Sequence, residues 1–153
     1  MQTKITNSMA YGFDGEHANG QPFRADTYVA SSEVTFGQPA FADGADGFNS
    51  AKATGTTYLG MFVGAHQHVR MVLPSDSRSL SVAAGTDVAV AARGSWFTST
   101  TEEWAVGDAL YIASYKYSKT DTDTTEVVVG HVVAVEAPEA GETLYRATVR
   151  LGE

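Results

Sequence analysis

The chain has 153 residues, of which 43% are hydrophobic and 18% are charged, and its formal net charge is −8. Because such an anion is repelled by phosphate backbones, the composition argues against direct nucleic-acid binding. The absence of cysteine excludes disulfides, thiolate catalysis and cysteine-ligated zinc.

The first 27 residues predict an extended N-terminal arm, and residues 28–153 predict one folded body. The arm is polar and rich in Gly and Asn, with no sustained hydrophobic period. Its spaced aromatic residues, Tyr11, Phe13 and Phe23, are candidate contacts with a neighbouring molecule. The arm is either a frayed terminus or a segment that orders against a partner. In the second case the body is expected to keep its stability when residues 2–24 are removed.

The body shows short β-prone runs separated by turns that contain Gly, Pro or Asp. The clearest run is residues 87–92, where Val88, Val90 and Ala92 alternate with other residues as in a half-buried strand. The other expected runs cover residues 28–30, 34–36, 58–63, 66–73, 78–82, 95–100, 109–117, 126–135 and 144–151. No helix of ten or more residues is expected. The pattern predicts an all-β fold, either a compact β-sandwich or a small β-barrel.

Few residues could carry chemistry. His66 and His68 have metal-ligand spacing and would share one face of a strand, but no third ligand is near in the sequence. Asp121 and Asp123 begin like a calcium loop, yet the sixth and twelfth positions lack the required Gly and Glu. No phosphate-binding or nucleophile motif occurs. The sequence therefore predicts no catalytic residue, no cofactor and no metal.

The sequence also predicts neither a signal peptide nor a membrane-spanning helix. The N-terminus is polar where a signal peptide needs an apolar core, so no signal peptide is expected. No apolar run reaches the roughly 20 residues that cross a bilayer as a helix. The sequence predicts no membrane partner.

Three stretches, in a fixed order, carry a resemblance. Residues 26–41 end in a Phe-Gly turn, and residues 59–63 read Leu-Gly-Met-Phe-Val. Residues 84–94 contain Gly-x-x-Val-x-Val and are followed by Val-Gly-Asp-Ala-Leu-Tyr-Ile at 106–112. This order of strands and turns, over residues 25–151, resembles the capsid cement (decoration) proteins of tailed bacteriophages.

The resemblance implies a virion structural protein that binds the outer surface of an icosahedral phage head and stabilises the capsid lattice. Its implied partners are the major capsid protein and further copies of itself, as a homotrimer, with neither nucleic acid nor membrane involved. It would be synthesised in the cytoplasm of the bacterial host and end up on the outer capsid surface. Tyr11, Phe13 and Phe23 would then contact the capsid or a neighbouring subunit.

A second interpretation stays open at this point. A β-rich module of a phage fibre could bind a glycan or a receptor, with Trp96, Trp104, Tyr115 and Tyr117 as its stacking platform. The two tryptophans are, however, more typical of a core. A hydrolase is disfavoured because no nucleophile is paired with a base.

Overall fold

The computed structural model describes residues 14–18, 23–43, 50–64, 81–120, 127–138, 140–141 and 143–152. These residues contain eleven strands and no helix, so the prediction of an all-β fold is confirmed. Accordingly, the described part of the chain holds no helix with the length and apolarity that a membrane span requires. The strands are β1 Arg24–Ala30, β2 Val34–Thr35, β3 Pro39–Ala42, β4 Ser50–Lys52, β5 Tyr58–Val63, β6 Ser81–Val82, β7 Asp87–Thr100, β8 Ala109–Ala113, β9 Lys116–Ser118, β10 Gly130–Glu136 and β11 Tyr145–Leu151.

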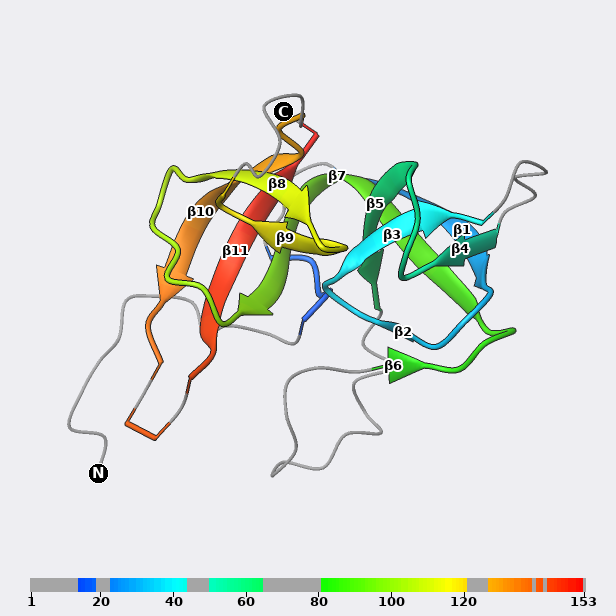
Figure 1. Ribbon diagram of the computed structural model, residues 1–153, viewed down its shortest axis with the longest axis horizontal. Coiled ribbons are helices and arrows are strands. Elements are labelled where there is room, and N and C mark those ends of the chain that lie inside the picture. The colour runs from blue at the N-terminus through cyan, green and yellow to red at the C-terminus, as the bar shows by residue number, and fades with distance from the viewer. Residues whose placement is uncertain are drawn as a thin grey trace.

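Five strands close into a small barrel, which forms the right-hand half of Figure 1. The order around the barrel is β1, β4, β3, β5 and the first half of β7. The β1–β4 pair is parallel and the other pairs are antiparallel. The ring closes where β1 pairs with β7, from Arg24↔Arg93 to Val29↔Asp87. Of the two architectures expected, the barrel is therefore the one found.

Strand β7 is the longest strand and joins the two halves of the molecule (Figure 1). Two separate strands were predicted here, at residues 87–92 and 95–100, and that prediction is wrong. Gly94 adopts φ +114°, and the β1–β7 register shifts between Arg24 and Ala25, so the strand bends instead of ending. The second half of β7 pairs with β11, from Gly94↔Leu151 to Thr100↔Tyr145.

The second half of the molecule is a sheet in which β7, β11, β10, β8 and β9 follow one another. Met61 of β5 and Ala91 of β7 face its core cluster, whereas their neighbours Phe62 and Val90 belong to the barrel cluster. Because side chains alternate along a strand, β5 and β7 fill both clusters at once. The barrel and the second sheet therefore share one framework.

The β8–β9 hairpin also differs from the prediction, which had one strand over residues 109–117. The chain reverses at Ser114 and Tyr115, whose φ angles are +50° and +63°, and Ala113 pairs with Lys116 across the turn. A two-residue turn with both φ values positive has the type I′ form, which usually contains Asn or Gly. The sequence shows neither residue there, so the turn was missed.

Residues 14–18 fall inside the predicted arm, but they pack against the body. β5 pairs with residues 89–91 of β7, and residues 14–18 lie beside a later part of the same strand. There, His17 forms an isolated bridge with Trp96. The main-chain hydrogen bonds run from Gly15 N–H to Phe97 O (2.7 Å), from Phe97 N–H to Glu16 O (3.0 Å), from Ala18 N–H to Ser95 O (2.9 Å) and from Gly64 N–H to Gly15 O (3.1 Å). The expectation that residues 2–24 lie apart from the body is therefore wrong for residues 14–18. An extended arm stays a prediction for residues 1–13 and 19–22, which lie outside the described residues, whereas residues 24–27 belong to β1 and not to an arm.

Candidate contact surface

The predicted contact residues have different outcomes in the structure. Tyr11 and Phe13 lie outside the described residues. Phe23 directly precedes β1, and 55% of its surface is exposed. Its ring centroid lies 4.6 Å from that of His17 and 5.3 Å from that of Trp96, which it meets nearly edge-on. Since Trp96 is buried, Phe23 stands on a packed aromatic base with its outer side facing solvent.

The position of Phe23 is fixed by the backbone beneath it. A Cβ atom at Gly94 would come within 2.6 Å of the Phe23 Cβ and 3.0 Å of the Trp96 Nε1. That Nε1 donates a hydrogen bond to the Arg93 carbonyl at 3.1 Å, which fixes the indole. A side chain held in place before binding loses less conformational entropy when a partner covers it.

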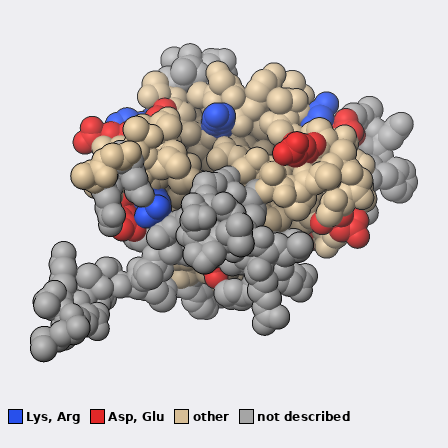
Figure 2. Space-filling view, turned by 90° about the horizontal axis from the view of Figure 1, so that it is seen from below, with Lys and Arg blue, Asp and Glu red and all other residues tan. Residues whose placement is uncertain are grey.

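Exposed apolar side chains occur on both halves of the molecule. Large hydrophobic side chains with substantial exposure among the described residues are Phe23, Val29, Val106, Tyr115, Val127 and Leu144. Figure 2 shows one face, on which the described atoms are mostly uncharged and the charged side chains are scattered. Contact through this face would depend mainly on apolar and neutral polar groups.

The aromatic platform of the glycan-binding interpretation is not assembled. Trp96 and Trp104 are each only 3% exposed, and Tyr117 is buried as well. All three belong to the core cluster of the second sheet. Tyr115 alone of the four is exposed, so no stacking surface for a sugar is formed by these residues.

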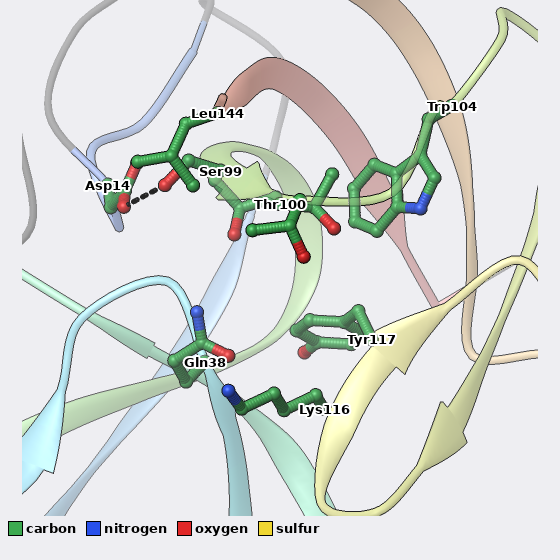
Figure 3. A pocket seen from close by; sticks show the side chains of 10 residues that line it. Asp14, Gln38, Ser99, Thr100, Trp104, Lys116, Tyr117 and Leu144 are labelled. Carbon is green, nitrogen blue, oxygen red and sulfur yellow. Dashed lines mark hydrogen bonds between the residues drawn. The ribbon is translucent and has the colours of Figure 1, made fainter. Parts of the chain in front are cut away.

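A groove lies where the β8–β9 hairpin approaches the barrel, and it is called the hairpin groove below. It consists of two cavities of about 230 and 310 Å³, which share Gln38 and Lys116. The smaller cavity is also lined by Asp14, Thr98, Ser99, Thr100, Thr101, Trp104, Tyr117 and Leu144 (Figure 3). The larger cavity is also lined by Glu33, Thr35, Ala53, Thr54, Ser114 and Tyr115. Sequence reasoning missed the groove because these residues come from separate segments.

Polar contacts fix the walls of the smaller cavity. Asp14 is buried and accepts a hydrogen bond from the Ser99 hydroxyl at 2.6 Å (Figure 3). Behind the cavity, Glu102 accepts hydrogen bonds from Trp104 Nε1 (2.8 Å), Ser118 Oγ (2.8 Å) and the Lys119 N–H (3.1 Å). Burial alone would raise the pKa of Glu102, but these hydrogen bonds outweigh it and lower that pKa. The ionised carboxylate therefore ties β9 to the loop that follows β7.

Tyrosines join the hairpin to the barrel. The hydroxyls of Tyr58 in β5 and Tyr117 in β9 lie 2.8 Å apart and share a hydrogen bond. At the hairpin tip, the Tyr115 ring meets that of Phe41 at a centroid distance of 5.7 Å. Burial raises the pKa of Tyr58 to about 12, although the hydrogen bond with Tyr117 acts against it. Burial and the neighbouring Tyr58 also raise the pKa of Tyr117 well above 10.

We expect this pair to make the protein sensitive to alkali. Below pH 10 the phenols of the folded and unfolded chains both keep their protons, so the stabilisation is complete. Above that pH the unfolded chain releases them while the folded chain retains them, and the free energy of unfolding falls as the pH rises towards 12. Denaturant unfolding measured across this range checks the expectation.

Tyr58→Phe is the control for that measurement. It should reduce the pH dependence, since one raised pKa is removed. It should also lower stability at neutral pH by roughly 1–3 kcal/mol, because the buried Tyr117 hydroxyl loses its partner. An unchanged alkaline slope in Tyr58→Phe would contradict this account of the pair.

Metal ligation has no support in the described part of the chain. No three His, Cys, Asp or Glu side chains among those residues lie close enough together to hold an ion. The sequence candidates His66, His68, Asp121 and Asp123 lie outside the described residues.

The structure thus defines an all-β protein built from a closed barrel of five strands with further strands beside it. The family model described as "Structural cement protein (E217 gp24/Pam3 gp6)" matches residues 1–148. The chain belongs to this family of phage structural cement proteins, and the resemblance seen in the sequence is confirmed. It is therefore a structural protein associated with the phage capsid. No match was found among curated proteins.

Proposed function

We propose that the protein binds the outer surface of an icosahedral phage head, contacts the major capsid protein and stabilises the capsid lattice as a homotrimer. Membership of the cement family supports a role in the virion. The observation that carries the proposal further is Phe23, a half-exposed aromatic side chain that Gly94 and Trp96 hold in place. Exposed aromatic side chains of this kind are enriched in the centre of protein interfaces.

The charge of the chain agrees with a protein partner. At a net charge of −8 the protein gains nothing from counterion release on DNA, so its affinity for the virion must come from protein contacts. A specific interface needs about 800 Å² per partner. In a homotrimer three such interfaces act together, so a modest contact per copy gives a much higher overall affinity. Closed cyclic symmetry also suits attachment to a symmetric shell.

Replacement of Phe23 by Ala is expected to weaken binding to heads. Full burial of a Phe side chain is worth roughly 1.5–3 kcal/mol, and about half of the ring is still available to a partner. We expect about a 5- to 10-fold loss of affinity per binding site, from a difference of about 1–1.4 kcal/mol. Titration of the variant onto undecorated heads, followed by pelleting, measures the loss.

Val127→Ala is the matched control, because Val127 is 77% exposed and precedes β10, which lies two strands away from β7 in the sheet. Phe23→Ala should also lower the unfolding free energy by roughly 1–2 kcal/mol, through its contacts with His17 and Trp96. Binding is therefore compared under conditions where both variants are folded. Equal affinity of Phe23→Ala and the unsubstituted protein would exclude Phe23 from the interface.

A further inference from the structure

We propose that the hairpin groove receives an extended segment of the capsid protein. The segment adds as a strand to the free edge of β9 and places a carboxylate side chain beside Lys116. This inference rests on the proposed function and specifies how one part of the surface is used.

The first observation is the free strand edge. β9 is the last strand of the nine-stranded sheet: it pairs with β8 on one side and, within the described ranges, with no strand on the other. In an antiparallel hairpin, hydrogen-bonded and non-hydrogen-bonded pairs alternate. Because the two-residue turn closes on Ala113↔Lys116, the main-chain N–H and C=O of Tyr117 point away from β8. These are the groups that an added strand would bind.

The second observation is the room beside that edge. β9 residues Lys116 and Tyr117 line the smaller cavity, and Lys116 together with the turn residues lines the larger one. Side chains of an added strand point alternately to its two faces. The cavities therefore offer space along the hairpin, with Leu144 in the wall of the smaller cavity and Tyr115 in the wall of the larger one.

The third observation concerns charge. Lys116 is exposed, lines both cavities and forms no ion pair with any residue that the structure describes. Of the two acidic residues of the groove, Asp14 accepts a hydrogen bond from Ser99, and Glu33 is the acidic residue that lines the larger cavity. A carboxylate on the incoming segment would thus find an available cation at Lys116.

The fourth observation is the conformation of the hairpin tip. Ser114 and Tyr115 both occupy the left-handed region, which costs a non-glycine residue about 1–2 kcal/mol. The turn presents Tyr115 with its ring packed on Phe41 and half of its surface exposed. The turn therefore places an aromatic side chain in the wall of the larger cavity, where an incoming segment can contact it.

The donor is assigned to the capsid protein because the chain belongs to a family of structural cement proteins, which associate with the capsid, and because Lys116 offers a cation to a carboxylate of that partner. A free edge can also pair with another copy of this chain. A short edge that carries a lysine is also a common protection against aggregation. The experiment must separate these alternatives.

The chain has no cysteine, so a single introduced thiol can carry a photo-crosslinker. Thr54→Cys places it in the wall of the groove, and Thr27→Cys is the control. Both threonines are exposed. β1 and β4 run parallel and pair at Ala30↔Ala51. Thr27 lies three residues before Ala30, and Thr54 lies three residues after Ala51. Because the strands run in the same direction, the two threonines lie towards opposite ends of the barrel.

Each labelled protein is bound to undecorated heads and irradiated, and the crosslinked peptide is identified by mass spectrometry. We expect the crosslinker at Thr54→Cys either to link to one segment of the capsid protein or to block binding to heads. The crosslinker at Thr27→Cys should do neither. Normal head binding without a Thr54 crosslink would overturn the proposal that the groove receives a capsid segment, while leaving the proposed function intact. A crosslink to another copy of this chain would overturn the choice of partner. Failure of the unsubstituted protein to bind heads would instead overturn the proposed function itself.

Lys116→Glu tests the carboxylate, and Lys116→Arg is its matched control, since it keeps the positive charge in the same place. Charge reversal at Lys116 should weaken head binding about 10-fold or more and reduce the yield of the Thr54 crosslink. Lys116→Arg should leave both nearly unchanged. Equal effects of the two substitutions would contradict a specific carboxylate at Lys116.

Discussion

Deletion of residues 2–18 is expected to lower the free energy of unfolding by roughly 3–6 kcal/mol relative to deletion of residues 2–13. The difference isolates residues 14–18, which make four main-chain hydrogen bonds to the body. A hydrogen bond contributes about 0.5–1.5 kcal/mol net, and an uncovered buried donor or acceptor costs about 1–3 kcal/mol. The deletion also uncovers Trp96, which His17 contacts at a ring centroid distance of 5.1 Å.

Since small domains are stable by about 5–15 kcal/mol, this loss would leave the shorter protein close to unfolding. Denaturant unfolding of the two truncated proteins measures the difference. A milder test is Gly15→Ala, because a Cβ there would come within 2.8 Å of the Phe36 Cβ and Gly15 adopts φ +80°. If the two truncated proteins were equally stable, and Gly15→Ala were as stable as the unsubstituted protein, residues 14–18 would contribute nothing to the stability of the body.

Gly60→Ala is expected to destabilise the barrel by about 3 kcal/mol or more, combining backbone strain with overpacking. Gly60 lies in β5 at φ +154°, and an added Cβ would overlap the main-chain oxygen of Ala91 in β7. It would also approach Val90 Cγ1 to 3.1 Å. Since β5 and β7 are neighbours in the closed ring, the two strands would have to separate there.

Gly85→Ala is the control for this substitution. Gly85 adopts φ +86°, but no atom lies within 4 Å of its added Cβ. The loss of stability in Gly85→Ala should therefore be limited to the backbone strain of a non-glycine residue at positive φ, about 1–2 kcal/mol. If both variants lost the same stability, crowding between β5 and β7 would not be the cause. Thermal or denaturant unfolding of the two proteins decides between the outcomes.

Local patterns predicted those parts of the fold that depend on local chemistry. The run at residues 58–63 coincides with β5, and the last predicted strand differs from β11 by one residue. β3 begins at Pro39, where the missing N–H is tolerated because it is the first residue of the strand. Period-2 alternation is a property of a single strand, so these elements could be read from the sequence.

The errors arose where tertiary pairing overrides local preference. Gly94 is typical of a strand end, but β1 and β11 occupy one edge of β7 on either side of it and keep the strand continuous. Ser114 and Tyr115 have no strong preference for a turn. The segment at residues 14–18 has no hydrophobic period because main-chain hydrogen bonds, which carry no sequence signature, hold much of it in place.

The candidate site shows the same division. Phe23 could be named as a candidate contact because an isolated aromatic residue in a polar segment is visible in the sequence, and the structure shows that it is exposed. The hairpin groove was not, because Gln38, Lys116 and Leu144 are brought together only by the fold. The tryptophans were interpreted correctly as core residues, since large aromatic side chains with one polar atom usually bury the ring and satisfy the N–H.

The most direct test of the central claim is to mix the purified protein with undecorated phage heads and pellet them over a range of protein concentrations. We predict saturable binding in multiples of three copies, only modestly weakened by moderate salt because apolar contact is little screened, and no binding to free DNA. A flat, non-saturating curve, together with a strictly monomeric sedimentation profile, would contradict the proposal that the protein stabilises the capsid lattice from outside.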